Sequence, residues 1–176
     1  MPKSSNWVAD NNIEIFYKHW GAMKADIINP FLSSVANVLS TMAMLEVSPG
    51  KPSIKNDNIS RGDISGIIGM TTDTINGSMA ITFPANVVFE IVNRMLGEQV
   101  NEINETVTDL VGELTNMVVG GAKGQLEESG YDIGMATPVV VTGKDHEVIH
   151  KGQGQNILMP FNSEPGAFYV EVCFDG

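Results

Sequence analysis

The sequence predicts an α+β fold, a two-layer sandwich in which helices pack on one face of a mostly antiparallel six-stranded sheet. Three observations favour it. Apolar residues make up 43% of the 176 residues and charged residues 18%, which is typical of a globular chain that buries a substantial core. Helical and strand-like segments are arranged in the order helix, three strands, two helices, three strands. Short turns separate the strands, and short connections favour antiparallel pairing.

The first helix is predicted over residues 25–42, because its apolar residues recur every three or four positions and form one buried stripe. That stripe consists of Ile27, Ile28, Phe31, Leu32, Val35, Val38, Leu39 and Met42. Residues 47–52 contain Ser-Pro-Gly-Lys-Pro and are expected to end the helix. Residues 1–22 hold both tryptophans and differ in composition from the rest of the chain. They are predicted to be an N-terminal extension of a single domain over residues 23–176.

Six segments rich in β-branched and aromatic residues, bounded by turn-forming residues, are predicted to be strands. They are residues 53–60, 64–70, 75–83, 138–142, 156–161 and 167–174. Pro84 ends the third strand, and a second helical stripe begins after it and is closed by Gly97. A third and longer helix is predicted over residues 105–128, with Gly130 as its C-terminal stop.

The charge balance disfavours several classes of partner. Ten Lys and Arg residues against 21 Asp and Glu residues give a net charge of −11, so nucleic acids and anionic membrane surfaces would be repelled. No apolar run reaches the roughly 18 residues of a membrane helix, and we expect a cytoplasmic protein. Cys173 is the only cysteine, so an intrachain disulfide is impossible, and a buried, inert thiol is expected.

The third predicted helix carries an unusual polar face. At about 100° per residue, its apolar residues form the side that packs on the sheet, while Asp109, Glu113, Asn116 and Gly120 cluster on the other side. Gly112 lies just beyond them, and a glycine inside a helix costs roughly 1 kcal/mol relative to alanine. Either these glycines clear the approach to Asn116, or they allow a neighbouring helix to pack closely on a solvated polar face. Spacing alone leaves both interpretations open.

A second motif indicates different chemistry. The segment His146-Glu147-Val148-Ile149-His150 matches H-E-x-x-H, the zinc-protease signature. That chemistry needs a helix, so that both histidines lie on one face and share a metal. Here the segment lies between predicted strands and Gly-rich turns, so surface histidines on a hairpin are expected and no metal site is predicted.

Asp109, Glu113, Asn116 and Pro138 together resemble the signature of the CheX/CheC/FliY chemotaxis phosphatases, and the chain is most similar to the CheX-type members. The signature is Asp or Ser, three residues, Glu, two residues, Asn, and then Pro after a longer gap. The similarity covers residues 23–174. It includes the segments Ile28-Asn29-Pro30-Phe31, Pro49-Gly50-Lys51-Pro52 and Asn76-Gly77-Ser78.

The number of sites is indicated by the first helix. Two-site members of this family carry a second Glu-x-x-Asn there, but Ser34-Val35-Ala36-Asn37 has Ser34 in place of Glu. We therefore expect one active site per chain. A residual second site at Asn37 is the alternative.

The resemblance implies a CheC-like fold and a substrate, the phosphoaspartate of a CheY-type response regulator. Asn116 would position the attacking water, and Glu113 would pair with the regulator's active-site lysine. Asp109, Gly112, Gly120 and Pro138 would support the site. No cofactor of its own is expected, because the regulator brings Mg²⁺. The alternative function is a module that binds a response regulator or motor component without catalysis.

The resemblance also implies a homodimer. The sequence adds β-rich segments such as residues 167–174, which would otherwise present an unpaired edge.

Overall fold

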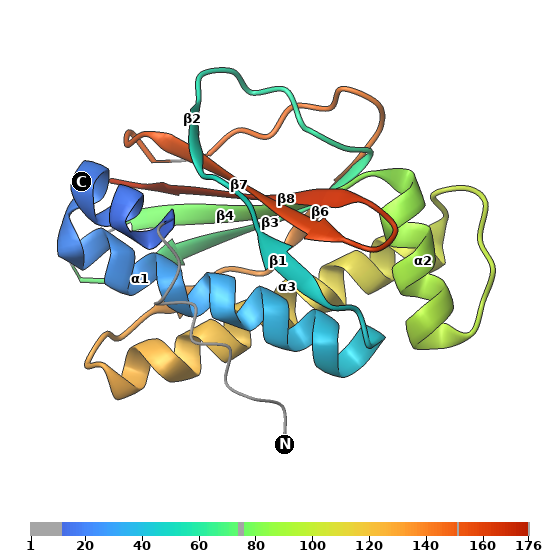
Figure 1. Ribbon diagram of the computed structural model, residues 1–176, viewed down its shortest axis with the longest axis horizontal. Helices are drawn as coiled ribbons and strands as arrows, with labels where there is room; N and C mark the ends of the chain where they lie inside the picture. The colour runs from blue at the N-terminus through green and yellow to red at the C-terminus, as the bar shows by residue number, and fades with distance from the viewer. Residues whose placement is uncertain (1–11, 74–75, 151, 176) are drawn as a thin grey trace.

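The computed structural model describes residues 12–73, 76–150 and 152–175, and the side chains of its first helix from Asp26 onward. Three helices and a single sheet form an α+β fold, which confirms the predicted class (Figure 1). The helices are α1 (Asn12–Ala43), α2 (Ala85–Leu96) and α3 (Glu105–Glu128). The strands are β1 (Val47–Pro49), β2 (Ser53–Lys55), β3 (Ile64–Thr71), β4 (Asn76–Phe83), β5 (Gly134–Met135), β6 (Val139–Thr142), β7 (Asn156–Ser163) and β8 (Ala167–Phe174).

The sheet has the strand order β1-β7-β8-β4-β3-β5, with β2 also pairing with β7 and β6 also pairing with β3. Every pairing between these strands is antiparallel. Helices α1 and α3 lie side by side along one face of the sheet, and α2 lies at one end (Figure 1). Buried Phe83, Phe161 and Phe168 pack together in the core, with ring centroids 5.2 Å apart in each contact.

The strands differ from the prediction in number, in the length of one strand and in which strand lies at an edge. The described sheet has eight strands rather than six, because the sequence does not predict β1 and β5, which are only three and two residues long. The strand predicted over residues 53–60 is confined to β2, since the chain then turns away from the sheet. The prediction that residues 167–174 present an edge of the sheet is wrong, because β8 pairs with β4 on one side and with β7 on the other.

The helix α1 begins earlier than predicted and crosses residues 22 and 23 without a break. The side chains before Asp26 lie outside the described part, so the division between an extension and a domain stays a prediction. Most of the predicted stripe is buried, from Ile27 to Leu39. Leu32 is half-buried, and Met42 has 43% of its surface exposed. No helix in the described part of the chain combines the length and the apolar character needed to span a bilayer.

The face of the sheet away from α1 and α3 carries a buried polar network. Lys55 Nζ donates to Glu171 Oε1 at 2.7 Å, and both side chains are fully buried. The second carboxylate oxygen accepts from His150 Nε2 at 3.1 Å and from Asn156 Nδ2 at 3.2 Å. Burial of Glu171 raises its pKa, but the hydrogen bonds from His150 and Lys55 outweigh that effect and leave the pKa below its ordinary value of 4.5. This ionised carboxylate therefore stabilises the fold.

Substitution Glu171→Gln is expected to lower the free energy of unfolding by roughly 1–3 kcal/mol at neutral pH, because Lys55 loses its charged acceptor. A lowered pKa contributes stability above the unfolded-state value, and that contribution disappears as the pH falls through the folded-state value. The difference between wild type and variant should therefore narrow in acid, where the wild-type carboxyl is protonated too. Urea denaturation of both proteins, from neutral pH down into acid, measures this difference in the free energy of unfolding. Equal stabilities at neutral pH would contradict the role of the ion pair.

Candidate active site

Helix α3 forms where the sequence places it because both of its ends are capped. Asn104 accepts a hydrogen bond from the backbone N–H of Val107 at 3.1 Å, and Gly130, with φ of 90°, adopts the left-handed conformation that stops the helix. The predicted apolar face is buried at Val107, Leu110, Val111, Leu114 and Val118, and Met117 is half-buried against the core. Gly121, which the helical period places on this face, is exposed. The buried apolar residues of α3 therefore determine which side of the helix faces away from the sheet.

The opposite face of α3 presents the predicted polar residues to solvent. Asp109, Glu113, Asn116 and Gly120 are all exposed, and Gly112 is half-buried. Within the described residues, the side chains of Asp109, Glu113 and Asn116 have no hydrogen-bond or ion-pair partner. Because Glu113 and Asn116 are three positions apart, their Cβ atoms are neighbours on the helix surface. The Glu113 carboxylate and the Asn116 amide thus lie side by side, and neither is bonded to another described residue.

The space around the two glycines favours the interpretation that they clear an approach. A Cβ atom at Gly120 would meet nothing within 4 Å, and one at Gly112 would lie 3.6 Å from Val140 Cγ2, an ordinary contact. Close helix packing occurs instead at Gly121, where a Cβ would collide with Ser34 Oγ of α1. Among the described residues, neither Gly112 nor Gly120 is therefore required for packing.

Substitutions Gly112→Leu and Gly120→Leu are expected to abolish activity towards a phosphorylated regulator while leaving thermal stability unchanged or raised. The alanine variants should gain up to about 1 kcal/mol of stability, since alanine is the better helix former. Melting temperatures and dephosphorylation rates of the same samples test this. If stability fell by the roughly 1–3 kcal/mol typical of overpacking, the glycines would be structural.

Pro138 immediately precedes β6, and this strand lies along α3. Gly112 of α3 lies close to Val140 of β6. Strand β6 is paired with β3, from Ile64↔Thr142 to Ile67↔Val139. Val139, the residue after Pro138, is 60% exposed. The structure thus brings the Pro138 strand beside the helix that carries Glu113 and Asn116.

The alternative second site on α1 lacks an acidic group. Asn37 is exposed, but Ser34, at the position of the motif's Glu, is buried and donates to the carbonyl oxygen of Val118 at 2.6 Å. Ser34 therefore joins α1 to α3 and does not face a partner. This geometry supports the prediction of a single site.

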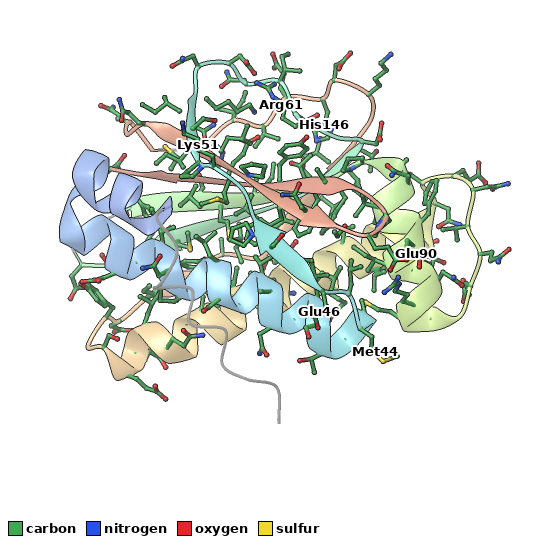
Figure 2. The ribbon with its side chains drawn as sticks, in the orientation of Figure 1. Met44, Glu46, Lys51, Arg61, Glu90 and His146 are labelled. Atoms are coloured by element: carbon green, nitrogen blue, oxygen red, sulfur yellow. The ribbon has the colours of Figure 1, made fainter. Side chains whose placement is uncertain are left out.

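The histidines of the H-E-x-x-H motif lie in an extended segment, not in a helix. His146 Nδ1 donates to the carbonyl of Gly143 at 2.7 Å, and its Nε2 lies 2.6 Å from Ser65 Oγ. His150 Nδ1 lies 2.6 Å from Ser78 Oγ. Both rings are buried against the side of the sheet opposite α1 and α3, where Figure 2 labels His146. The expectation of surface histidines is therefore wrong.

The separation of these two histidines excludes a shared metal. Ser65 pairs with Thr82 of β4, and Ser78 lies four residues from Thr82 on the same strand. At about 3.3 Å per residue the two anchoring points are about 13 Å apart, whereas two zinc-binding nitrogens must each lie about 2 Å from one ion. The motif is therefore structural: His150 belongs to the polar network around Glu171, and His146 contacts Ser65 and Gly143.

A close contact between β3 and α3 was not predicted from the sequence. Gly66 of β3 and Thr115 of α3 are both buried, and a Cβ at Gly66 would collide with Thr115 Oγ1. A glycine inside a strand indicates a close approach by another segment. That signal is present in the sequence, but it does not identify the approaching residue.

Comparison with known proteins agrees with this geometry. The chemotaxis phosphatase CheX family matches residues 64–162. The CheY-P phosphatase CheX of Thermotoga maritima is 29% identical over 158 residues, which cover 88% of this chain and all of the relative. A CheC-like superfamily protein from Shewanella sp. PV-4 is 56% identical, with a TM-score of 0.81 over 86% of this chain and 98% of the other.

A third relative shares the fold at a lower level of identity. The CheX in the CheX-CheY-BeF3-Mg complex from Borrelia burgdorferi is 21% identical, with a TM-score of 0.72 over 85% of this chain and 98% of that one. The family match alone spans more than half of the 176 residues, and it includes β3, β6 and the whole of α3. With the Glu113 and Asn116 helix and the Pro138 strand both inside the matched region, the chain belongs to the chemotaxis phosphatase CheX family.

Proposed function

We propose that this chain is a phosphatase that accelerates dephosphorylation of the phosphoaspartate of a CheY-type response regulator. The observation that carries the proposal is the pair Glu113 and Asn116 on the exposed face of α3, whose side chains have no partner among the described residues. Gly120 beside them has open space around it, and a Cβ at Gly112 would make only an ordinary contact with Val140. Asn116 positions the attacking water, and Glu113 pairs with the regulator's active-site lysine. The net charge of −11 favours a partner whose docking surface is basic.

An amide suits the proposed role at Asn116 better than a carboxylate. Its Oδ1 accepts a hydrogen bond from water while its Nδ2 donates another, and it adds no negative charge near the phosphoryl group. The water oxygen attacks phosphorus, the bond to the aspartate oxygen breaks, and its electron pair stays on the aspartate carboxylate. The proton released by the water passes to phosphate or solvent. Most of the acceleration would come from placing the water in line.

No cofactor of the chain's own is proposed. Mg²⁺ belongs to the regulator, where it would neutralise charge on the phosphoryl oxygens. Family membership supports the substrate, since the Thermotoga maritima relative is named as a CheY-P phosphatase. The partner is supported by the Borrelia burgdorferi protein, whose structure was solved together with CheY, BeF3 and Mg.

The experiment that tests the proposal measures loss of phosphate from a phosphorylated CheY-type regulator with and without the chain. Faster decay at substoichiometric chain supports catalysis. If the chain bound the beryllofluoride-activated regulator without changing the decay rate, the alternative of a non-catalytic binding module would hold instead.

We also propose that the chain forms a homodimer, on the resemblance to CheX-type proteins alone. Strand β8 is paired on both sides and therefore offers no free edge; the edges of the described sheet are β1 with β2, and β5 with β6. Unpaired edges of this kind favour association with another chain. Light scattering at micromolar concentration should give twice the monomer mass, and a monomeric mass would contradict the proposal.

A further inference from the structure

We infer that Gly66 is a positioning residue for this reaction, because it sets the distance between α3, which carries Asn116, and β6, which begins directly after Pro138. The inference rests on the proposed phosphatase function. It concerns a residue in the middle of β3 that lies beneath the helix.

Gly66 contacts both halves of the proposed site. Along the sheet it pairs with Val140 of β6, and above the sheet it lies against α3. A Cβ atom built on Gly66 would collide with Thr115 Oγ1 and would lie 3.1 Å from Thr115 Cβ and 3.3 Å from Val111 Cγ1. The absence of a side chain at Gly66 therefore allows α3 to approach β3 and β6 as closely as it does.

Thr115 has little freedom to move aside for a larger residue at Gly66. Its side chain is fully buried, and Oγ1 donates to the carbonyl oxygen of Val111 at 2.7 Å. A β-branched side chain in a helix has few rotamers. An added methyl group at Gly66 would therefore shift the backbone of α3 at the residue next to Asn116.

The turn of α3 after Asn116 is anchored, so the displacement would distort the site rather than move it as a unit. Ser34 Oγ of α1 donates to the carbonyl oxygen of Val118 at 2.6 Å, and both side chains are buried. The Asn116 turn would move outward relative to this contact. Placement of a water for in-line attack tolerates little error, and a displacement of about 1 Å can cost about 100-fold in rate.

The first test compares Gly66→Ala with Gly69→Ala. Both glycines lie on β3, but Gly69 faces the other side of the sheet, where its Cβ would lie an ordinary 3.9 Å from Ala136 Cβ. Gly66→Ala is expected to lower the maximal dephosphorylation rate at saturating chain by about 10- to 100-fold. Its affinity for the beryllofluoride-activated regulator should change less than about threefold, since charge attraction falls slowly with distance. Gly69→Ala should match wild type in both measurements.

The second test asks for rescue from the helix side. Thr115→Ala removes the atom that collides, whereas Thr115→Val keeps the branched shape and removes only the hydrogen bond. Combined with Gly66→Ala, the Thr115→Ala change should restore a substantial part of the maximal rate, and Thr115→Val should not. Circular dichroism of every single and double variant checks that it folds. If Gly66→Ala alone fails to fold, the rates of the two double variants are compared with each other to test the inference.

The outcomes separate this inference from the proposed function. Wild type that leaves regulator decay unchanged would overturn the phosphatase function, and the inference with it. Active wild type with an equally active Gly66→Ala would overturn the inference alone. So would double variants that behave alike, or a Gly66→Ala defect confined to affinity.

Discussion

Substitution Asn116→Ala is expected to lower the acceleration of regulator dephosphorylation by about 100-fold or more, the loss typical when one positioned transition-state contact is removed. Affinity for the phosphorylated regulator should stay within about threefold, because water placement is a rate effect and Asn116 carries no charge to attract the partner. The exposed amide has no partner among the described residues, so its loss leaves no group unsatisfied in the fold. Single-turnover decay and binding measurements on the same variant test both parts.

Asn37→Ala supplies the matched control for this variant. Asn37 is an exposed asparagine on the neighbouring helix α1, so the same atoms are removed away from the proposed site. The Asn37→Ala variant should retain wild-type activity, and that result would also argue against a residual second site at Asn37. Near-wild-type turnover by Asn116→Ala would remove the water-positioning role.

Substitution Glu113→Ala should weaken docking as well as rate. Loss of one partner of a close interfacial charge pair costs about 2–5 kcal/mol, which corresponds to roughly 30-fold or more in affinity. The maximal rate should fall too, because the regulator's lysine helps to fix the docking register. Titration of the beryllofluoride-activated regulator measures the affinity, and raising the salt concentration should narrow the difference between variant and wild type.

Glu128→Ala controls for net charge in this experiment. Glu128 is an exposed carboxylate at the far end of α3, so its removal changes the total charge equally. Its affinity should match that of wild type. If Glu113→Ala also bound like wild type, Glu113 would lie outside the interface.

Local signals in the sequence are sufficient to predict α3 and its two faces. The helix starts after Asn104 and stops at Gly130 because single residues cap it, and its buried face is set by a period of 3.6 residues. Caps and periodicity act over a few residues, so a sequence without structure carries them. The exposed position of Glu113 and Asn116 is predictable for the same reason.

Features that depend on distant segments are not predictable in this way. Strands β1 and β5 are two or three residues long and exist only because longer strands offer them hydrogen bonds. His146 and His150 are buried on one face of the sheet, where they contact polar side chains from β3, β4 and β8. The contact between Gly66 and Thr115 joins residues 49 positions apart, which no local pattern links.

The proposed activity of this chain is to accelerate, through Asn116, hydrolysis of a phosphoaspartate held by a CheY-type regulator. The most direct measurement tracks the decay of a phosphorylated regulator in the presence of Mg²⁺ as wild-type chain, or Asn116→Ala, is added in increasing amounts. We predict that the decay rate rises with wild-type concentration to a plateau, and that it stays near the spontaneous rate with Asn116→Ala. Decay that remained spontaneous with wild-type chain, for a regulator shown to bind it, would contradict the proposed activity.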